Sequence, residues 1–177
     1  MADIIYCLVG RSGSGKTTVG KELDKRGYNV IQSYTTRAPR TEDEWGHTFV
    51  DAKDYAHTED KPWHGDNVIA YNKIYGHHYW ATKEQYEGKG ASIYIIDPPG
   101  VDILREKVDV PIVVIYLAVS DNTCYFRMQK ERGKEEAFER IMKDQKKYAC
   151  VPTHFTVDAS RRIDDVVDLV EGVIKKF

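Results

Sequence analysis

Apolar residues occur along the chain in short runs, and these runs alternate with longer segments of helical periodicity. Strands that are buried on both faces of a parallel sheet are expected to be apolar at consecutive positions. Five such strands are predicted: Ile4–Val9, Asn29–Ile31, Ala91–Ile96, Ile112–Leu117 and His154–Val157. The alternation of strands and helices predicts an α/β fold with a parallel sheet flanked by helices.

The helical segments lie between and after these strands. The first is followed by Gly27, a residue type typical of the position just beyond a helix end. In the last, the apolar residues between Ile163 and Ile174 fall on one helical face. The predicted helices are Lys16–Arg26, Val101–Lys107, Asp121–Lys130, about Glu135–Ala149 and Ile163–Phe177.

One region interrupts the pattern. From Gln32 to Trp80 the chain is polar and aromatic, with little helical periodicity. Its aromatic content is too high for a disordered insertion. We expect a small, mainly β subdomain at about residues 32–82, inserted after the second strand. The chain has 177 residues, a length that suits one domain spanning residues 1–177.

Charge and composition limit the partners. Lys and Arg number 26 against 28 Asp and Glu, so no general affinity for nucleic acid is expected. The longest apolar stretch, Pro111–Val119, is too short to span a bilayer, and no basic segment precedes the first apolar run as in a signal peptide. The three cysteines have no C-x-x-C spacing. These features predict a cytoplasmic protein without membrane partners, acting as a monomer or homodimer.

The stretch "GRSGSGKT", Gly10–Thr17, joins the first strand to the first helix and matches G-x-x-x-x-G-K-[ST]. Its glycines allow backbone N–H groups to surround a phosphate, and the helix N-terminus favours an anion. Lys16 is placed to reach the β- and γ-phosphates, and Thr17 to ligate Mg²⁺. An ordinary glycine-rich turn is the alternative. The predicted site for ATP and Mg²⁺ comprises Gly10, Ser12, Gly13, Ser14, Gly15, Lys16, Thr17 and Thr18.

A second candidate site follows the second strand. Arg37 and Arg40 flank Ala38 and Pro39, and the proline stiffens the turn between them. Two guanidinium groups held close together suit bidentate binding of a phosphate. Taken alone, the same residues could equally be surface arginines of a solvated loop.

The P-loop followed by "SYTTRAPR", Ser33–Arg40, resembles the guanylate kinase family of nucleoside monophosphate kinases, which carries S-x-T-T-R-x-P-R in its acceptor-binding subdomain. The segments "YGHHYWAT" and "IIDPPGV" and the arginines near 127–140 extend the resemblance over most of the chain. The resemblance implies a P-loop NTPase fold with an inserted acceptor subdomain and a lid at about residues 127–142. It also implies transfer of the ATP γ-phosphoryl group to a small-molecule nucleotide, an NMP or dNMP.

The resemblance also implies residue roles. Arg37 and Arg40 would hold the 5′-phosphate of the acceptor, and Ser33 would face its base. Tyr79 lies where the family has a phosphate-binding tyrosine, and His47 lies near another tyrosine position of the family. The lid arginines Arg127, Arg132 and Arg140 would join Lys16 as the catalytic residues, and "VDAS", 157–160, resembles the adenine-side loop of related kinases.

Asp97 ends an apolar run, at the edge of the sheet where parallel strands bind ligands. It is expected either to order the waters of Mg²⁺, with Thr17 as the other metal residue, or to contact the acceptor nucleoside. The alternative is a helix N-cap. Because Pro98, Pro99 and Gly100 separate Asp97 from the helix expected at Val101, this alternative is disfavoured.

One position departs from the family pattern. Guanylate kinases carry a glutamate about nine residues before the tyrosine that aligns with Tyr79, and it binds the guanine edge. Here that position is Ala70, whose methyl group accepts no hydrogen bond. Tyr71, Tyr75, His77 and Tyr79 could instead receive another base. Guanine specificity is therefore not expected. A pyrimidine deoxynucleotide such as dTMP is the leading candidate, and a broad-specificity enzyme is next.

Two other functions remain open. Guanylate kinase-like domains also occur as non-catalytic protein-interaction modules, but such a module has no need of Lys16 and Thr17. The chain could also be a P-loop kinase of another small phosphorylated metabolite. The Arg37 and Arg40 pair weighs against an acceptor without a phosphate.

Overall fold

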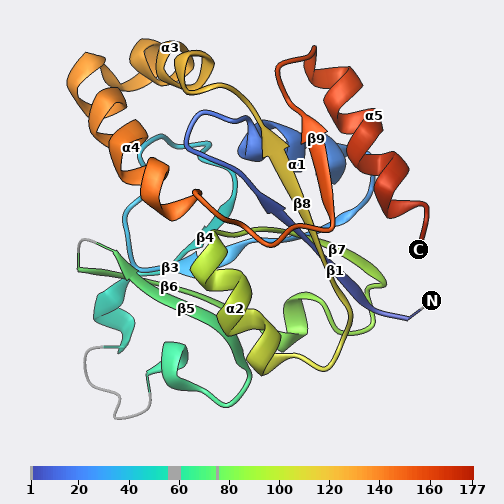
Figure 1. Cartoon of the computed structure of the whole chain (residues 1–177). Coiled ribbons are helices and arrows are strands. Elements are labelled where there is room, and N and C mark those ends of the chain that lie inside the picture. The colour runs from blue at the N-terminus through green and yellow to red at the C-terminus, as the bar shows by residue number, and fades with distance from the viewer. Residues whose placement is uncertain (1, 56–60, 75) are drawn as a thin grey trace.

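A computed structural model of the chain describes residues 2–55, 61–74 and 76–177. Its central sheet has five parallel strands in the order β2-β7-β1-β8-β9 (Figure 1). The strands are β1 Ile4–Val9, β2 Asn29–Ile31, β7 Ala91–Ile95, β8 Ile112–Ala118 and β9 Phe155–Asp158. The α/β prediction is confirmed, and each predicted strand end lies within one residue of the observed one.

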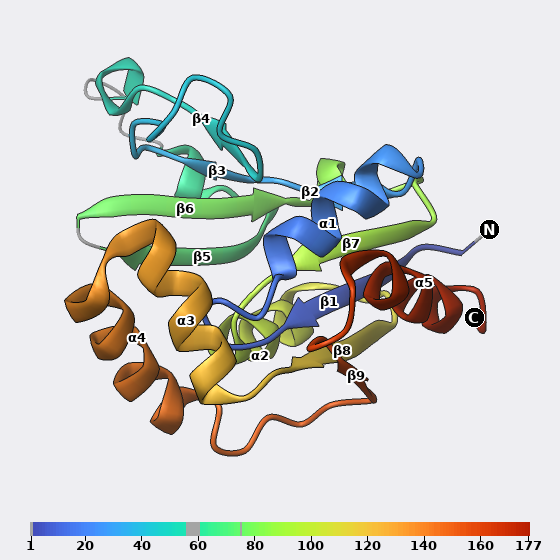
Figure 2. The same cartoon turned by 90° about the horizontal axis from the view of Figure 1, so that it is seen from above.

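Helices cover both faces of this sheet (Figure 2). Alternate residues of β1 point to opposite faces: Tyr6 and Leu8 join the core beneath α1 (Lys16–Lys25) and α5 (Ile163–Ile174). Ile5 and Cys7 join the core beneath α2 (Pro98–Lys107). In the described part of the chain, no helix has both the length and the apolar composition needed to cross a bilayer.

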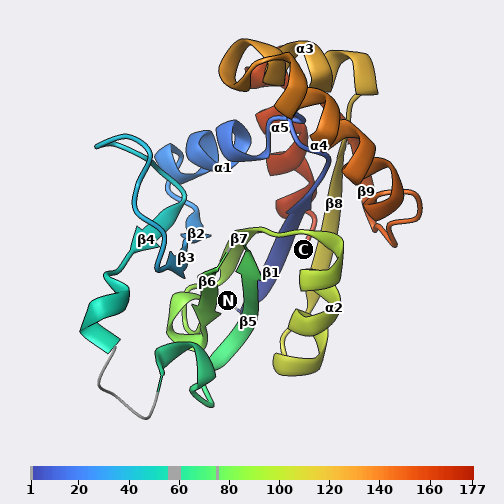
Figure 3. The ribbon, with the colours of Figure 1, turned by 90° about the vertical axis from the view of Figure 1, so that its left-hand side faces the viewer.

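The remaining helices, α3 (Asp121–Arg132) and α4 (Lys134–Lys147), pack on each other beside the P-loop (Figure 3). Gly133 separates them with a φ of 85°, in the left-handed region that favours glycine. The two helices span the segment predicted to form the lid.

A second sheet of order β4-β3-β6-β5 lies in the region that interrupted the apolar pattern. Its strands are β3 Ser33–Thr35, β4 His47–Phe49, β5 Val68–Ile74 and β6 His77–Thr82, with 3₁₀ turns at Ala52–Tyr55, Pro62–His64 and Lys83–Gln85. Aromatic stacking holds it together: the Trp63 ring lies 4.0 Å from that of His78, and Tyr34 stacks on Trp80.

The start of α2 differs from the prediction. The helix begins at Pro98 instead of Val101, and Asp97 is its N-cap, with its carboxylate accepting a hydrogen bond from the Gly100 N–H at 3.0 Å. Proline is tolerated in the first helical turn because the N–H groups there have no partner within the helix. The disfavoured N-cap alternative is therefore the observed one.

Candidate functional site

Two adjacent cavities lie beside the P-loop. The smaller, about 440 Å³, is lined by the P-loop and by residues of α3 and α4, and the larger, about 930 Å³, extends to the second sheet and the start of α2. Ser12, Lys16 and Arg140 line both. The two cavities therefore meet at one point, where an ammonium and a guanidinium group are available.

The structure brings most of the predicted site residues to these cavities. Ser12 to Thr18 and the three lid arginines line the smaller one. Gly10 lines neither, and its carbonyl accepts a hydrogen bond from Lys16. The seven predicted acceptor residues all line the larger cavity: Ser33, Arg37, Arg40, His47, Ala70, Tyr79 and Asp97.

The P-loop backbone has the shape of an anion cradle. Gly13 and Gly15 have φ angles of 77° and 95°, which side chains rarely allow. A Cβ atom at Gly13 would lie 2.7 Å from the Cys124 carbonyl oxygen. Ser14 Oγ is buried and has no hydrogen-bond partner in the described residues. These features fit the phosphates of a nucleotide, whose oxygens would accept from the loop.

Lys16 is the half-buried cation of this cradle. Its Nζ donates to the carbonyl oxygens of Gly10 at 2.5 Å and Arg11 at 2.9 Å. Burial lowers the pKa of Lys16 to about 8, and the nearby charge of Asp144 opposes this shift. Lys16 is therefore mostly protonated at neutral pH and carries a positive charge where the cavities meet.

Asp144 is a site residue that the sequence did not reveal. It lies on α4, is buried, and its Oδ2 accepts a hydrogen bond from the Ser12 N–H at 2.6 Å. It also lines the larger cavity. The sequence signal that could have identified Asp144 was its helical spacing. Ala137, Ile141 and Asp144 form the buried face of α4, and a carboxylate is rarely buried unless it has a hydrogen-bond or charge partner.

The lid arginines differ in their contacts. Arg127 donates to the carbonyl oxygens of Gly13 at 3.3 Å and Ala159 at 3.2 Å, and so ties α3 to the P-loop and to the "VDAS" loop after β9. Arg132 and Arg140 both pair with Glu136, at 3.2 and 2.9 Å. Arg140 alone of the three also lines the larger cavity.

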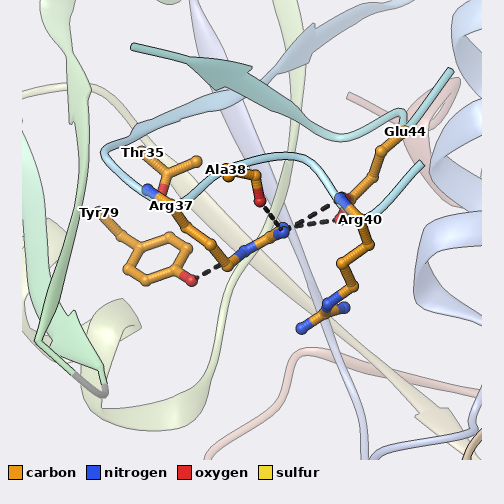
Figure 4. Close-up of polar contacts among 6 residues, drawn as sticks. All are labelled: Thr35, Arg37, Ala38, Arg40, Glu44 and Tyr79. Atoms are coloured by element: carbon orange, nitrogen blue, oxygen red, sulfur yellow. Dashed lines mark hydrogen bonds and ion pairs between the residues drawn. The ribbon is translucent and has the colours of Figure 1, made fainter. Parts of the chain in front are cut away.

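Arg37 and Arg40, the two arginines predicted to bind the acceptor phosphate, are not equivalent (Figure 4). Arg37 forms a bidentate pair with Glu44, at 2.7 and 3.1 Å, and donates through Nε to the Tyr79 hydroxyl at 3.2 Å. The hydrogen bond from Arg37 lowers the pKa of Glu44 to about 2. The Arg40 side chain has no hydrogen bond or ion pair with any described residue, although its backbone N–H donates to Glu44. The exposed Arg40 guanidinium thus lines the cavity without a direct side-chain partner, although its charge contributes to the lowered pKa of Glu44.

The far end of the larger cavity carries hydroxyl and aromatic groups. Ser33 Oγ lies 3.1 Å from Tyr94 Oη, and Ala70 is buried against the same cavity. His47 packs its ring 5.5 Å from that of Tyr79, and burial lowers the pKa of His47, so the ring is neutral at neutral pH. Tyr71 and His77 also line the cavity, whereas Tyr75 lies outside the described residues.

The two predicted metal residues do not share a cavity. Thr17 lines the smaller one, and Asp97 lines the larger one. The Asp97 carboxylate already caps α2 and pairs with Lys147 Nζ at 2.5 Å. In the described ranges, no group of three or more His, Cys, Asp or Glu side chains is arranged to hold a metal ion. Of the two predicted metal residues, Thr17 is therefore the one that lies in the P-loop cavity.

Comparison with known sequences finds relatives along nearly the whole chain. No protein-family model matches it. The chain is 28% identical to a guanylate kinase of Wolbachia sp. subsp. Brugia malayi (strain TRS), covering 98% of this chain and 92% of that protein. A guanylate kinase of Wolbachia pipientis wMel is 26% identical, with coverage of 98% and 90%.

Solved structures show the same architecture. The crystal structure of guanylate kinase from Anaplasma phagocytophilum superposes with a TM-score of 0.65 at 16% identity, covering 99% of this chain and 86% of that one. A gluconokinase from Sinorhizobium meliloti 1021 superposes with a TM-score of 0.54 at 17% identity, with coverage of 99% and 92%. The fold is that of P-loop kinases, and the predicted resemblance of this chain to the guanylate kinase-like P-loop family is confirmed.

Proposed function

We propose that the chain is an ATP-dependent kinase of nucleoside monophosphates, with ATP and Mg²⁺ in the smaller cavity and the acceptor nucleotide in the larger one. The observation that carries the proposal is the junction of the two cavities at Ser12, Lys16 and Arg140. A phosphoryl group that passes between two bound nucleotides must cross such a point. The curated relatives, which are guanylate kinases, support the same assignment.

The chain's own residues would act by positioning and charge neutralisation, the main contributions to phosphoryl transfer. Bound Mg-ATP would supply the γ-phosphoryl group and the charge of the metal ion, and Thr17 would be the residue that holds the ion. Lys16 and Arg140 would stabilise the charge that develops on the transferred group. Arg40 would bind the acceptor phosphate directly. Arg37 is already fixed by its hydrogen bonds to Glu44 and Tyr79, and it would orient the phosphate.

The acceptor is proposed to carry a base other than guanine. Ala70 stands where the family's base-reading glutamate would be, and it lines the cavity. Guanine would bury the N1–H and 2-amino donors without that acceptor. The cytoplasmic location and the monomeric or homodimeric state remain predictions from the sequence.

A coupled assay with Mg-ATP and a panel of common NMPs and dNMPs tests the proposal. Lys16→Ala should lower kcat/KM by about a hundredfold or more, because the lysine stabilises transition-state charge. Lys21→Ala, which removes an exposed lysine from the same helix, is the matched control and should leave turnover unchanged. Near-normal transfer by Lys16→Ala would refute the mechanism. The absence of turnover with every nucleotide would favour an interaction module instead.

A further inference from the structure

Two hydroxyl groups that lie within hydrogen-bond distance of each other line the larger cavity. Ser33 lies at the start of β3 and Tyr94 lies on β7, and their oxygens are 3.1 Å apart. Both side chains line the cavity, and Tyr94 is only 4% exposed. Burial raises the pKa of Tyr94, so its phenol keeps its proton near neutral pH.

A bonded pair of hydroxyls can be polarised in two ways. Each hydroxyl has one proton to donate and lone pairs that accept. If Tyr94 donates to Ser33, the pair offers a donor at Ser33 and an acceptor at Tyr94. If Ser33 donates to Tyr94, the two roles are exchanged. Rotation about the two C–O bonds turns the hydroxyl hydrogens and exchanges donor and acceptor without moving a heavy atom. An ionised carboxylate can only accept.

These two states match the two kinds of pyrimidine edge. Thymine and uracil present a carbonyl acceptor at C4 beside the N3–H donor, and cytosine presents an amino donor at C4 beside the N3 acceptor. We propose that Ser33 and Tyr94 form a reversible reader of the pyrimidine edge, so that the acceptor site takes both thymine- or uracil-type and cytosine-type monophosphates. This inference rests on the proposed function of the same cavity.

Guanine fits this reader less well. Its O6 and N1–H groups resemble the thymine edge, but its 2-amino group adds a further donor. The pair has only one donor and one acceptor to offer in either state, and the methyl group of Ala70 supplies no further acceptor. The reader therefore admits both pyrimidine classes and disfavours guanine.

Steady-state kinetics with dTMP, dUMP and dCMP test the proposal. In the unmodified protein, kcat/KM for dTMP and dCMP should agree within about tenfold, because one polar contact pair serves both. Tyr94→Phe and Ser33→Ala should each lower kcat/KM about tenfold or more for both bases. The change should appear mainly as a higher KM, because the neutral hydrogen bond to the base is lost in the substrate complex as well as in the transition state. The ratio of kcat/KM for dTMP to that for dCMP should stay constant.

Tyr6→Phe is the matched control. It removes another buried hydroxyl, which lies on the opposite face of the sheet and donates a hydrogen bond to the Ile174 carbonyl. This variant should leave KM unchanged.

Two results would overturn the reader. One is a preference of the unmodified protein for one pyrimidine class by more than about a hundredfold, a discrimination that a fixed polar group gives. The other is a variant that impairs only one class. Calorimetric titration of the unmodified protein with dTMP and dCMP separates this inference from the proposed function. If no nucleotide is phosphorylated, the kinase assignment fails. Equal dissociation constants of dTMP and dCMP would still support the reader in that case. The absence of binding by both nucleotides would refute the reader.

Discussion

At the scale of single residues, Ala70 occupies the position where the resemblance to the guanylate kinase family implies a base-reading glutamate. Ala70 lines the larger cavity, as do Ser33 and Tyr94. A guanine 2-amino group placed there would lose its hydrogen bonds to water without gaining an acceptor. The site should therefore favour a base that lacks this group.

We predict that IMP, which is GMP without the 2-amino group, is the better substrate of the two. The expected gain in kcat/KM is about tenfold, because an unpaired buried donor costs about 1–3 kcal/mol. Ala70→Glu should reverse the order by supplying an acceptor. Ala70→Met has a similar length but no such acceptor and should not reverse it. A preference of the unmodified protein for GMP over IMP would contradict the prediction.

The sequence predicts a residue's role where that role depends on a local pattern. Gly13 and Lys16 lie in a short motif whose spacing indicates phosphate binding, whereas the role predicted for Arg37 depends on the resemblance to the guanylate kinase family. Tyr94 gave no such signal, because a tyrosine within an apolar strand is typical of a core residue. Its chemical role depends on Ser33, which is 61 positions away in the sequence.

At the scale of elements, α4 links the two cavities. It carries Arg140 to the junction and Asp144 onto the Ser12 N–H, so that a carboxylate occupies a backbone donor of the P-loop. The phosphates of ATP are also anions, and they would accept hydrogen bonds from the N–H groups of the P-loop. The carboxylate and the phosphates should therefore repel each other.

Asp144→Asn should tighten ATP binding. The amide oxygen of asparagine can still accept from Ser12, so the link to α4 is kept while the negative charge is lost. Because the Asp144 charge also raises the pKa of Lys16, the titration is done at about pH 6, where Lys16 stays protonated in both proteins. We expect the dissociation constant of Mg-ATP, measured there by calorimetry, to fall about fivefold, since a charge pair at the edge of a protein contributes about 1 kcal/mol. Glu135→Gln neutralises an exposed carboxylate on the same helix that lines neither cavity, and it should have little effect. Weaker binding by Asp144→Asn would mean that the carboxylate assists the ligand.

The helix boundaries show why element ends are harder to predict than elements. All five strands of the central sheet were predicted, since a buried strand is apolar at consecutive positions. The start of α2 was missed because "PPG" was taken to interrupt the helix, whereas the prolines occupy its first turn. Only the path of the chain around Asp97 distinguishes the two interpretations.

At the scale of the whole molecule, the site is assembled from distant segments. The hydrogen bond between Ser12 and Asp144 joins residues 132 positions apart, and that between Arg127 and Gly13 joins residues 114 apart. Neither the burial of Lys16 nor the charges near it could be deduced from the P-loop motif. Asp144 and Lys147 on α4 and Asp97 at the N-cap of α2 all contribute to the electrostatic field at Lys16.

This assembly predicts a pH dependence of ATP binding. Because burial lowers the pKa of Lys16 to about 8, the ammonium loses its proton in the free protein as the pH rises through that value. The phosphates stabilise the ammonium, so the pKa should be higher in the complex, and binding above pH 8 should take up a proton. The dissociation constant of Mg-ATP should be constant between about pH 7 and 7.5 and then rise towards about tenfold per pH unit.

Calorimetric titration in buffers of different ionisation enthalpy would measure how many protons are taken up on binding. Lys16→Arg keeps its charge throughout this range and should abolish the proton uptake; a constant affinity of the unmodified protein up to about pH 9.5 would contradict the lowered pKa.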